Sequence, residues 1–398
     1  MARDLALREL TGRRSDHLLF ALATEEDNED LRRLFRQNPM RGRISLSLER
    51  EPNYFADANL PGEAKQTIIA REGNRLACAG SCTVRMRFVN GKVCRVGYLG
   101  GLRLAESLSG RFDILRRGYE FFHELQAENP ADFYFTSIAS DNERARRMFE
   151  RGLRGMPRYE FLGEFITLLI PTSPDRRLGM RGRPDDSVRA TPHDRDVEGL
   201  RQGCPPSLFP DELAALLNHK NSAYQFAPCW SVEELAALEP LGLGLSDFEV
   251  LSERGKIVAC TALWDQRVFK QTVIKGYEPS LARSRSVLNF ISRLTGGTRL
   301  PAVGEALAQA FISHTVVPPD ASGTLIGLLS RLRARAAQRG IELLTVGFDA
   351  NDPRLALLRR NARGREYRSC LYLVSWAETD AVPREPGKPL LAPEVALL

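Results

Sequence analysis

The chain has 398 residues, enough for two domains that each bury a core of their own. Its formal net charge is +6, carried almost wholly by arginine, which fits phosphate recognition but equally a coding bias. It opens with mixed charge rather than a signal peptide, and no run approaches the roughly 18 apolar residues that a membrane span needs. Seven scattered cysteines without CxxC spacing favour reduced thiols over zinc. We therefore expect a cytoplasmic protein without a metal site or membrane contact.

The amino-terminal part predicts a helix followed by strands. Thr24 is a suitable cap for the helix, acidic residues follow in its first turn, and Leu31, Leu34 and Phe35 face inward. Apolar residues predict three strands after it, over residues 44–48, 67–71 and 76–88.

An Asn-Gly pair at 90–91 is the strongest short hairpin signal in the sequence. If those two residues form the loop, Val89 pairs with Lys92, and Arg87 lies opposite Cys94. That register implies no disulfide across the hairpin.

Residues 96–125 organise the amino-terminal half. A buried strand is expected over 96–104, a polar crossing over 105–111 and a helix over 112–125. A strand that leads through small residues into a helix leaves backbone N–H groups aimed at the crossing, and these favour an anion such as a phosphate. The expected inner face of the helix carries residues at steps of three and four: Phe112, Leu115, Tyr119, Phe122 and Leu125.

Three more elements complete this half before a stretch rich in proline, glycine and arginine. They are a strand over 132–138, a helix over 143–151 that residues 140–142 cap, and a strand over 161–170.

The second half repeats this order. Residues 73–78 match 255–260 at a hairpin, and 141–144 match 351–354 at a polar cap that opens a helix. The longer spacing in the second half fits one inserted helical segment around 279–294, so a duplicated domain is predicted. The predicted division is a first domain over 1–170, a linker over 171–186, a second domain over 187–376 and an extended tail over 377–398.

The order of strand, crossing, helix, strand and asparagine-capped helix resembles the GNAT acyltransferases, which use acetyl-CoA or a longer acyl-CoA. Residues 104–114 stand where that family has V-x-P-x-x-R-G-x-G-x-G, whose backbone N–H groups hold the pyrophosphate of CoA. Gly110 and Arg111 fit this motif. The departures are Ser109 in place of the arginine, and Phe112 and Ile114 in place of two later glycines.

A later N-x-x-A-x-x-L-Y motif, which lines the thiol end of CoA in that family, fits better. Asn142, Ala145 and Met148 stand at its Asn, Ala and Leu positions, and Phe149 replaces its tyrosine. The two motifs recur in the second half, so the chain is similar to tandem GNAT families such as mycothiol synthase and the Fem peptidyl transferases. The second-half residues concerned are Gly323, Gly327 and Asn351, with Leu358 in the tyrosine place.

The resemblance implies an α/β fold of two tandem GNAT-like domains, each a mixed, mostly antiparallel twisted sheet flanked by helices. It implies transfer of an acetyl or other acyl group to the amine of a small molecule or peptide, with acetyl-CoA as co-substrate. The alternative is a scaffold without turnover that binds acyl-CoA or a protein partner. Aminoacyl transfer from a charged tRNA ranks last, because no long basic helix indicates nucleic-acid binding. The duplication allows an internal pseudo-dimer, and the oligomeric state stays open.

By the same resemblance, CoA would lie along a strand edge, the crossing and the asparagine cap. The residues concerned are Leu102, Arg103, Leu104, Ser109, Gly110, Arg111, Phe112 and Asn142. The catalytic acid and base are not evident, because every candidate is at least as typical of an ordinary core or surface position. The candidates are Tyr134 and Tyr159 for the acid, and Glu49, Glu51, Glu106, His123 and His314 for the base.

Overall fold

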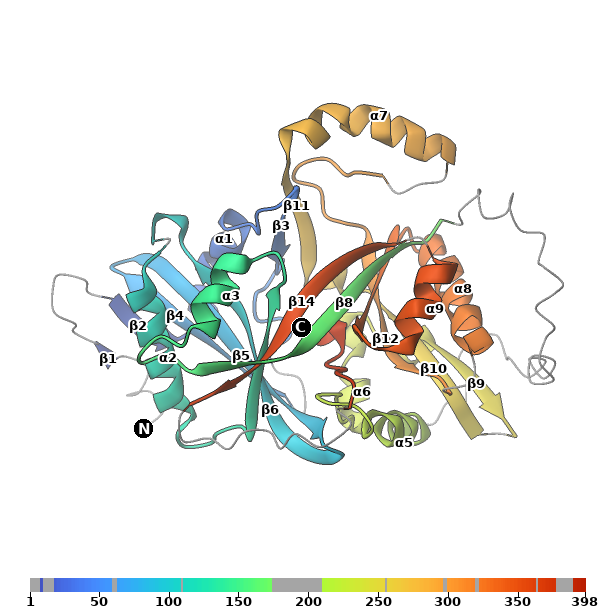
Figure 1. Cartoon of the computed structure of the whole chain (residues 1–398), viewed down its shortest axis with the longest axis horizontal. Coiled ribbons are helices and arrows are strands. Elements are labelled where there is room, and N and C mark those ends of the chain that lie inside the picture. Colours follow the sequence, from blue (N-terminus) through green and yellow to red (C-terminus); the bar gives the residue numbers. More distant parts are fainter. Residues whose placement is uncertain are drawn as a thin grey trace.

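The computed structural model describes ten stretches of the chain, and Ser109 and most of the expected linker lie outside them. A large, mostly antiparallel sheet with helices on both faces dominates these stretches, and a separate two-stranded ribbon stands beside it (Figure 1). The α/β fold class expected from the sequence is confirmed. The described residues are 8–9, 18–58, 63–108, 110–173, 210–254, 256–295, 299–318, 322–362, 364–376 and 389–398.

Twelve strands form the large sheet within the described residues. In spatial order they are β1 (Arg8–Glu9), β2 (Leu18–Leu22), β4 (Glu63–Glu72), β5 (Arg75–Val89), β6 (Lys92–Leu104), β7 (Phe133–Ala139), β14 (Arg365–Ser375), β8 (Arg158–Pro171), β13 (Leu343–Asp349), β12 (Gln309–Val316), β10 (Lys256–Trp264) and β9 (Phe248–Glu253). The ribbon pairs β3 (Ile44–Glu49) with β11 (Gln271–Tyr277).

Successive side chains along each strand point to opposite faces of the sheet, and helices cover both faces. Helices α2, α3, α8 and α9 pack on one face, and α1, α5 and α6 on the other. The α-helices are α1 (Asn28–Gln37), α2 (Phe112–Gln126), α3 (Glu143–Glu150), α5 (Pro210–Asn221), α6 (Val232–Ala236), α7 (Pro279–Thr295), α8 (Ser322–Gln338) and α9 (Pro353–Asn361). Short 3-10 helices are η1 (Glu25–Asp27), η2 (Glu106–Leu108), η4 (Glu239–Leu241), η5 (Leu245–Asp247), η6 (Gln266–Val268) and η7 (Val395–Leu397). No helix among the described residues is long and apolar enough to cross a membrane.

Several local predictions in the first half are confirmed. Thr24 caps η1 in a reciprocal arrangement with Asp27, and the residues expected on the inner face of α1 are buried. The Asn-Gly hairpin has the expected register, since Val89 pairs with Lys92 and Arg87 lies opposite Cys94. The six described cysteines are all free thiols.

The buried face of α2 differs from the predicted one. Ile114, Phe121 and Phe122 are buried, whereas Phe112 is 47% exposed and Leu115 only half-buried. The helix is therefore rotated about its axis relative to the expected orientation. Ile114 and Phe121 reach a cluster with β2, β4 and β5 that local periodicity did not reveal.

The last strands of the two halves are exchanged. β14, from the second half, lies between β7 and β8 of the first, while β8 lies between β14 and β13. Figure 1 shows β14 and β8 running side by side. Ser369 pairs with Ala139 on β7, and Phe165 on β8 pairs with Asp349 on β13. Each half thus completes the sheet of the other, and the domain boundaries expected from the sequence stay a prediction.

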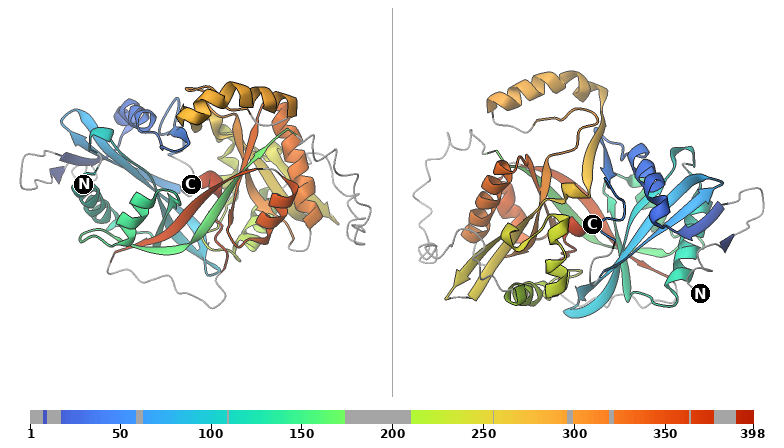
Figure 2. Two further views of the ribbon diagram at one scale, coloured as in Figure 1. Left: turned by 45° about the horizontal axis from the view of Figure 1, so that its top comes forward. Right: turned by 180° about the vertical axis from the view of Figure 1, so that it is seen from behind.

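The strand that precedes the inserted helix α7 reaches the first half. This strand is β11, which pairs with β3 from Gln271–Glu49 to Tyr277–Ile44. Helix α7 stands clear of the sheet in the view of Figure 1 and in the view from behind in Figure 2. The predicted inserted helix is confirmed, but the pairing of the strand before it, β11, with the first half was not expected.

Candidate functional site

The first half contains an opening between two parallel strands. β6 and β7 pair from Val96–Phe133 to Leu99–Thr136, where the Thr136 hydroxyl donates to the Leu99 carbonyl at 2.6 Å. Beyond that point both strands continue without pairing to each other, β6 to Leu104 and β7 to Ala139. We call the space between these two ends the first opening.

A bulge on β6 shapes the edge of the first opening. The register with β5 shifts between Ser81 and Ala79, and Gly101 adopts a positive φ of 63° there. The Ala105 amide donates to β5 at 2.8 Å, so by alternation the Arg103 amide faces β5 as well. The amides of Leu102 and Leu104 therefore point into the first opening.

The crossing after β6 uses some of the amides that the sequence assigned to a diphosphate. The Arg111 amide donates to the Leu108 carbonyl at 3.1 Å, and the Phe112 amide to that of Gly110 at 3.0 Å. Of the crossing residues expected to contact CoA, Arg111 and Phe112 therefore have amides that are already bonded within the chain. The Arg111 side chain binds both carboxylate oxygens of Asp113, at 2.8 and 2.7 Å, which holds the pKa of Asp113 below its usual value.

Arg144, a residue that the sequence analysis missed, brings a free positive charge to this crossing. Asn142 caps α3 as expected, its side chain accepting from the Ala145 amide at 3.2 Å, and so directs Arg144 toward Gly110. The Arg144 Nη2 lies 3.6 Å from where a Cβ on Gly110 would be. The side chain is exposed and has no partner among the described residues. The sequence signal that could have indicated Arg144 is its position, as a basic residue two positions after the capping asparagine.

Both tyrosines considered as catalytic acids have their hydroxyls occupied. The Tyr134 hydroxyl accepts from the Ala131 amide at 3.0 Å and donates to Gln126 at 3.2 Å. The Tyr159 hydroxyl bonds that of Tyr119, and burial raises the pKa of both phenols. Phe149, in the tyrosine place of the motif, stacks on Tyr159 at 4.4 Å within the same core. These positions carry no free proton donor into the first opening.

The candidate bases of the first half are also engaged. His123 lies exposed on α2 and stacks on Trp376 at 5.1 Å. Each candidate carboxylate is ion-paired with one or two cations. The pairs are Glu106 with Arg41, Glu49 with Lys275 and Arg36, and Glu51 with Arg32 and Arg36.

A buried group of ionisable side chains, also missed by the sequence analysis, lies on the α1 face of the sheet. Asp57 bonds Arg50 at 2.6 Å and Lys65 at 2.5 Å, and these cations keep the pKa of Asp57 low despite burial. Lys270 donates to the backbone oxygen of Leu398 at 2.7 Å, and burial lowers its pKa to about 7.

The second half repeats the opening and the bulge. β12 and β13 pair from Gln309–Leu343 to Phe311–Thr345 and then part. The register with β10 shifts between Cys260 and Ala262, and His314 has a φ of 52° at that bulge, as Gly101 does in the first half. We call the space beyond Phe311 and Thr345 the second opening.

The carboxyl-terminal segment closes the second opening. The His314 amide donates to the Glu394 carboxylate at 3.0 Å, and η7 packs against both β12 and β13. A Cβ on Gly347 of β13 would lie 2.8 Å from the Val395 Cβ. Burial raises the pKa of Glu394 to about 7 and lowers that of His314 to about 3. His314, proposed as a base from the sequence, thus lies packed 4.4 Å from the Trp230 ring behind this segment.

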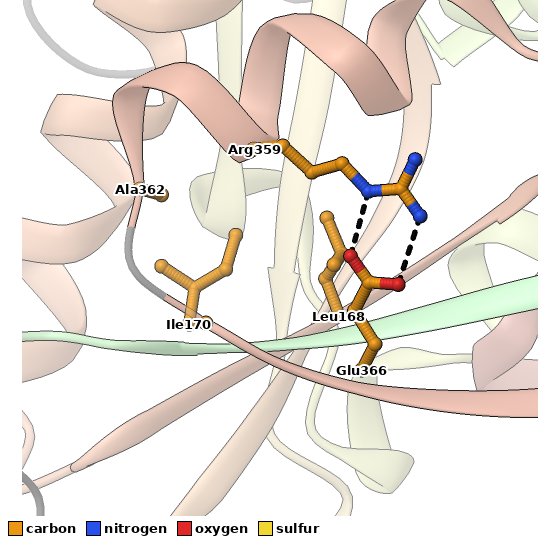
Figure 3. A pocket seen from close by; sticks show the side chains of 6 residues that line it. Leu168, Ile170, Arg359, Ala362 and Glu366 are labelled. Carbon is orange, nitrogen blue, oxygen red and sulfur yellow. Dashed lines mark hydrogen bonds and ion pairs between the residues drawn. The ribbon is translucent and has the colours of Figure 1, made fainter.

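A cavity of about 420 Å³ lies elsewhere, beneath the end of α9 (Figure 3). The two charged residues that line it are paired with each other, because Arg359 donates to both carboxylate oxygens of Glu366 at 2.6 and 2.8 Å. Leu168 and Ile170 line it from β8 at the closed end of the β12–β13 pair. None of the strand-edge residues that define the two openings lines this cavity. No group of acidic, histidine or cysteine side chains in the described part of the chain is placed to hold a metal ion.

The fold is that of the GNAT-type N-acyltransferases. An N-myristoyltransferase from Saccharomyces cerevisiae, with bound myristoyl-CoA, has a TM-score of 0.58 at 12% identity, over 98% of this chain and 83% of that one. A GCN5-related N-acetyltransferase from Sphaerobacter thermophilus has a TM-score of 0.53 at 13% identity, over 93% and 99%. No protein-family model matches the sequence, and no curated protein gives a significant match. At these identities the likeness defines the fold.

Proposed function

We propose that the chain is an acyl-CoA-dependent N-acyltransferase that binds its thioester in the first opening. Acetyl is the expected acyl group, and the acceptor is the amine of a small molecule or peptide. The observation that carries this proposal is the contrast between the openings. At the strand edge of the first, Gly101 is exposed and Leu102 is 38% exposed, whereas Glu394 and Val395 occupy the second.

The first opening offers what a thioester needs. An amide of Leu102 or Leu104 can donate to the carbonyl oxygen, where negative charge develops during acyl transfer. The other strand-edge groups can pair with the amides of pantetheine. Arg144 lies at the crossing beside the amino terminus of α2, where a phosphate is favoured. That the Saccharomyces cerevisiae N-myristoyltransferase holds myristoyl-CoA on the same fold supports this placement.

Calorimetric titration with acetyl-CoA tests the proposal. Wild type should bind, and Arg144→Gln should bind about tenfold more weakly, since one charge-assisted contact to phosphate is lost. Arg147→Gln is the matched control, because Arg147 lies on the same helix and is paired with Glu143. No heat above background with wild type would contradict the proposal.

Turnover separates the enzyme from the alternative scaffold. CoA release from acetyl-CoA should rise in the presence of at least one class of primary amine. Binding without release across a broad amine panel would favour a scaffold that holds acyl-CoA without transfer.

A further inference from the structure

Strand exchange brings one tyrosine of the second half to the first opening. Tyr367 pairs with Thr167 on β8, two residues beyond the last β7 pair of β14, Ser369–Ala139. Leu371 and Leu373, at steps of two from Tyr367, pack on the face of the sheet that carries Phe135. The Tyr367 ring therefore lies on this face, just past the end of β7.

Tyr98 of β6, a strand that borders the first opening, lies on this same face of the sheet. Its ring packs on Phe135 at 5.1 Å, and its hydroxyl bonds Ser137 of β7 at 2.7 Å. Ser137 in turn lies opposite Leu371 on β14. Tyr98 and Tyr367 thus stand on the same side of the sheet, one on each strand that borders β7.

The Tyr367 phenol is influenced by residues on both edges of the first opening. Its surroundings include Arg103 and Tyr98 on β6 and Asp141 after β7. Burial, with a smaller contribution from Asp141, raises the pKa of Tyr367 to about 12, so the hydroxyl stays protonated at neutral pH. Tyr367 is nevertheless 41% exposed, and its hydroxyl bonds no described residue. It is a free donor at the mouth of the first opening.

Acyl transfer from a thioester is accelerated by such a donor. When the amine nitrogen bonds to the carbonyl carbon and the C–S bond breaks, the electron pair of that bond passes to sulfur. A donor near sulfur stabilises the developing thiolate. Phe149 cannot fill this role, and the hydroxyls of Tyr134 and Tyr159 are occupied.

We propose that the Tyr367 hydroxyl donates a hydrogen bond to the sulfur of acyl-CoA bound in the first opening, so that the second half supplies a catalytic residue to the first. The inference rests on the proposed function. In the overall step the amine loses one proton and the CoA thiolate gains one, giving an amide and free CoA. Tyr367 keeps its own proton and stabilises the thiolate until that exchange is complete.

The thiol pKa of bound CoA tests this role without a known acceptor. It is measured by difference absorbance of the thiolate, with desulfo-CoA as the reference, for wild type and for Tyr367→Phe. Loss of a hydrogen bond to a charged sulfur should lower the ionisation constant of the bound thiol about tenfold or more. The dissociation constant for desulfo-CoA should stay unchanged, because Tyr367 contacts only the sulfur.

Tyr372→Phe is the matched control. Tyr372 lies on the same strand but faces α3, where its hydroxyl donates to Glu150 at 2.5 Å. A thiol pKa that is equal in wild type and Tyr372→Phe, but higher in Tyr367→Phe, is the expected result. Equal values in wild type and Tyr367→Phe would overturn the inference and leave CoA binding intact. Absence of CoA binding in wild type would instead overturn the proposed function itself.

Discussion

Two glycines of β6 serve different needs. A Cβ on Gly97 would lie 2.6 Å from a carbon of the Tyr134 ring, so the ring requires the bare backbone. Gly101 instead supplies the positive φ of the bulge. One position therefore concerns the packing of the core, and the other shapes the edge of the first opening.

Gly97→Ala should lower the free energy of unfolding by about 1–3 kcal/mol, because the added methyl group displaces the Tyr134 ring in a packed core. Denaturant unfolding measures this change in the free energy of unfolding. Gly327→Ala is the control, since Gly327 lies within α8 with nothing within 4 Å of its added Cβ. That variant should be unchanged or slightly more stable. A neutral Gly97→Ala would contradict the packing argument.

The lowered pKa of His314 predicts how the free energy of unfolding depends on pH. Its pKa is about 3 in the folded chain against an ordinary value of 6.5, so below pH 6.5 the unfolded chain binds a proton that the folded chain does not. Its contribution to stability is complete above pH 6.5 and falls toward pH 3, by at most about 1.4 kcal/mol per pH unit.

The test compares wild type with His314→Asn, because asparagine tolerates the positive φ at that position. Glu394, whose raised pKa has the opposite effect between pH 7 and 4.5, remains in both chains. From pH 6.5 to 4.5, wild type should lose stability more steeply than the variant. If denaturant unfolding gave the same dependence of stability on pH for both chains, His314 would not be held neutral in the folded protein.

At the scale of elements, η7 and the residues around it hold the second opening closed. Ala396 is 3% exposed and belongs to the core of the second half. Ala396→Asp should therefore lower the free energy of unfolding by about 2–5 kcal/mol, because it buries a carboxylate that has no hydrogen-bonding or charged partner there. Val303→Asp, at a site 62% exposed, is the control and should unfold at nearly the wild-type temperature. Equal melting temperatures for the two variants would argue against a packed carboxyl-terminal segment.

Elements set by local patterns were predictable. The Asn-Gly turn fixed the β5–β6 register as far as Ser81–Gly100, and Asn142 marked the start of α3. The register beyond Ser81 was not predictable, because the bulge at Gly101 depends on the parting of β6 from β7. The face of α2 was wrong for a related reason, since Ile114 packs on strands distant in sequence.

At the scale of the whole molecule, pairing between the halves escaped prediction entirely. Nothing in the sequence near Ser369 indicates that β14 inserts beside β7, and nothing near Leu46 indicates that β3 pairs with Ile274 of β11. Long-range pairing is decided by the complete sheet rather than by local propensity. Arg144 and Tyr367 were missed because Arg144 comes from α3 to lie beside Gly110 and Tyr367 comes from the second half.

The exchanged strands predict one cooperative unfolding transition. Because β8 and β14 each complete the sheet of the other half, neither half can unfold while the other keeps its native strand pairs. Scanning calorimetry should give a single peak whose calorimetric and van't Hoff enthalpies agree. Two resolved transitions would mean that the halves are independent in stability.

We propose that the first opening binds acyl-CoA and that the second is closed by the chain itself. A crystal structure with a non-hydrolysable acetyl-CoA analogue tests it most directly. We predict one analogue per chain between β6 and β7, with its carbonyl oxygen on the amide of Leu102 or Leu104 and a phosphate near Arg144. An analogue between β12 and β13, with Val395 displaced, or an empty first opening at saturating analogue would contradict the account.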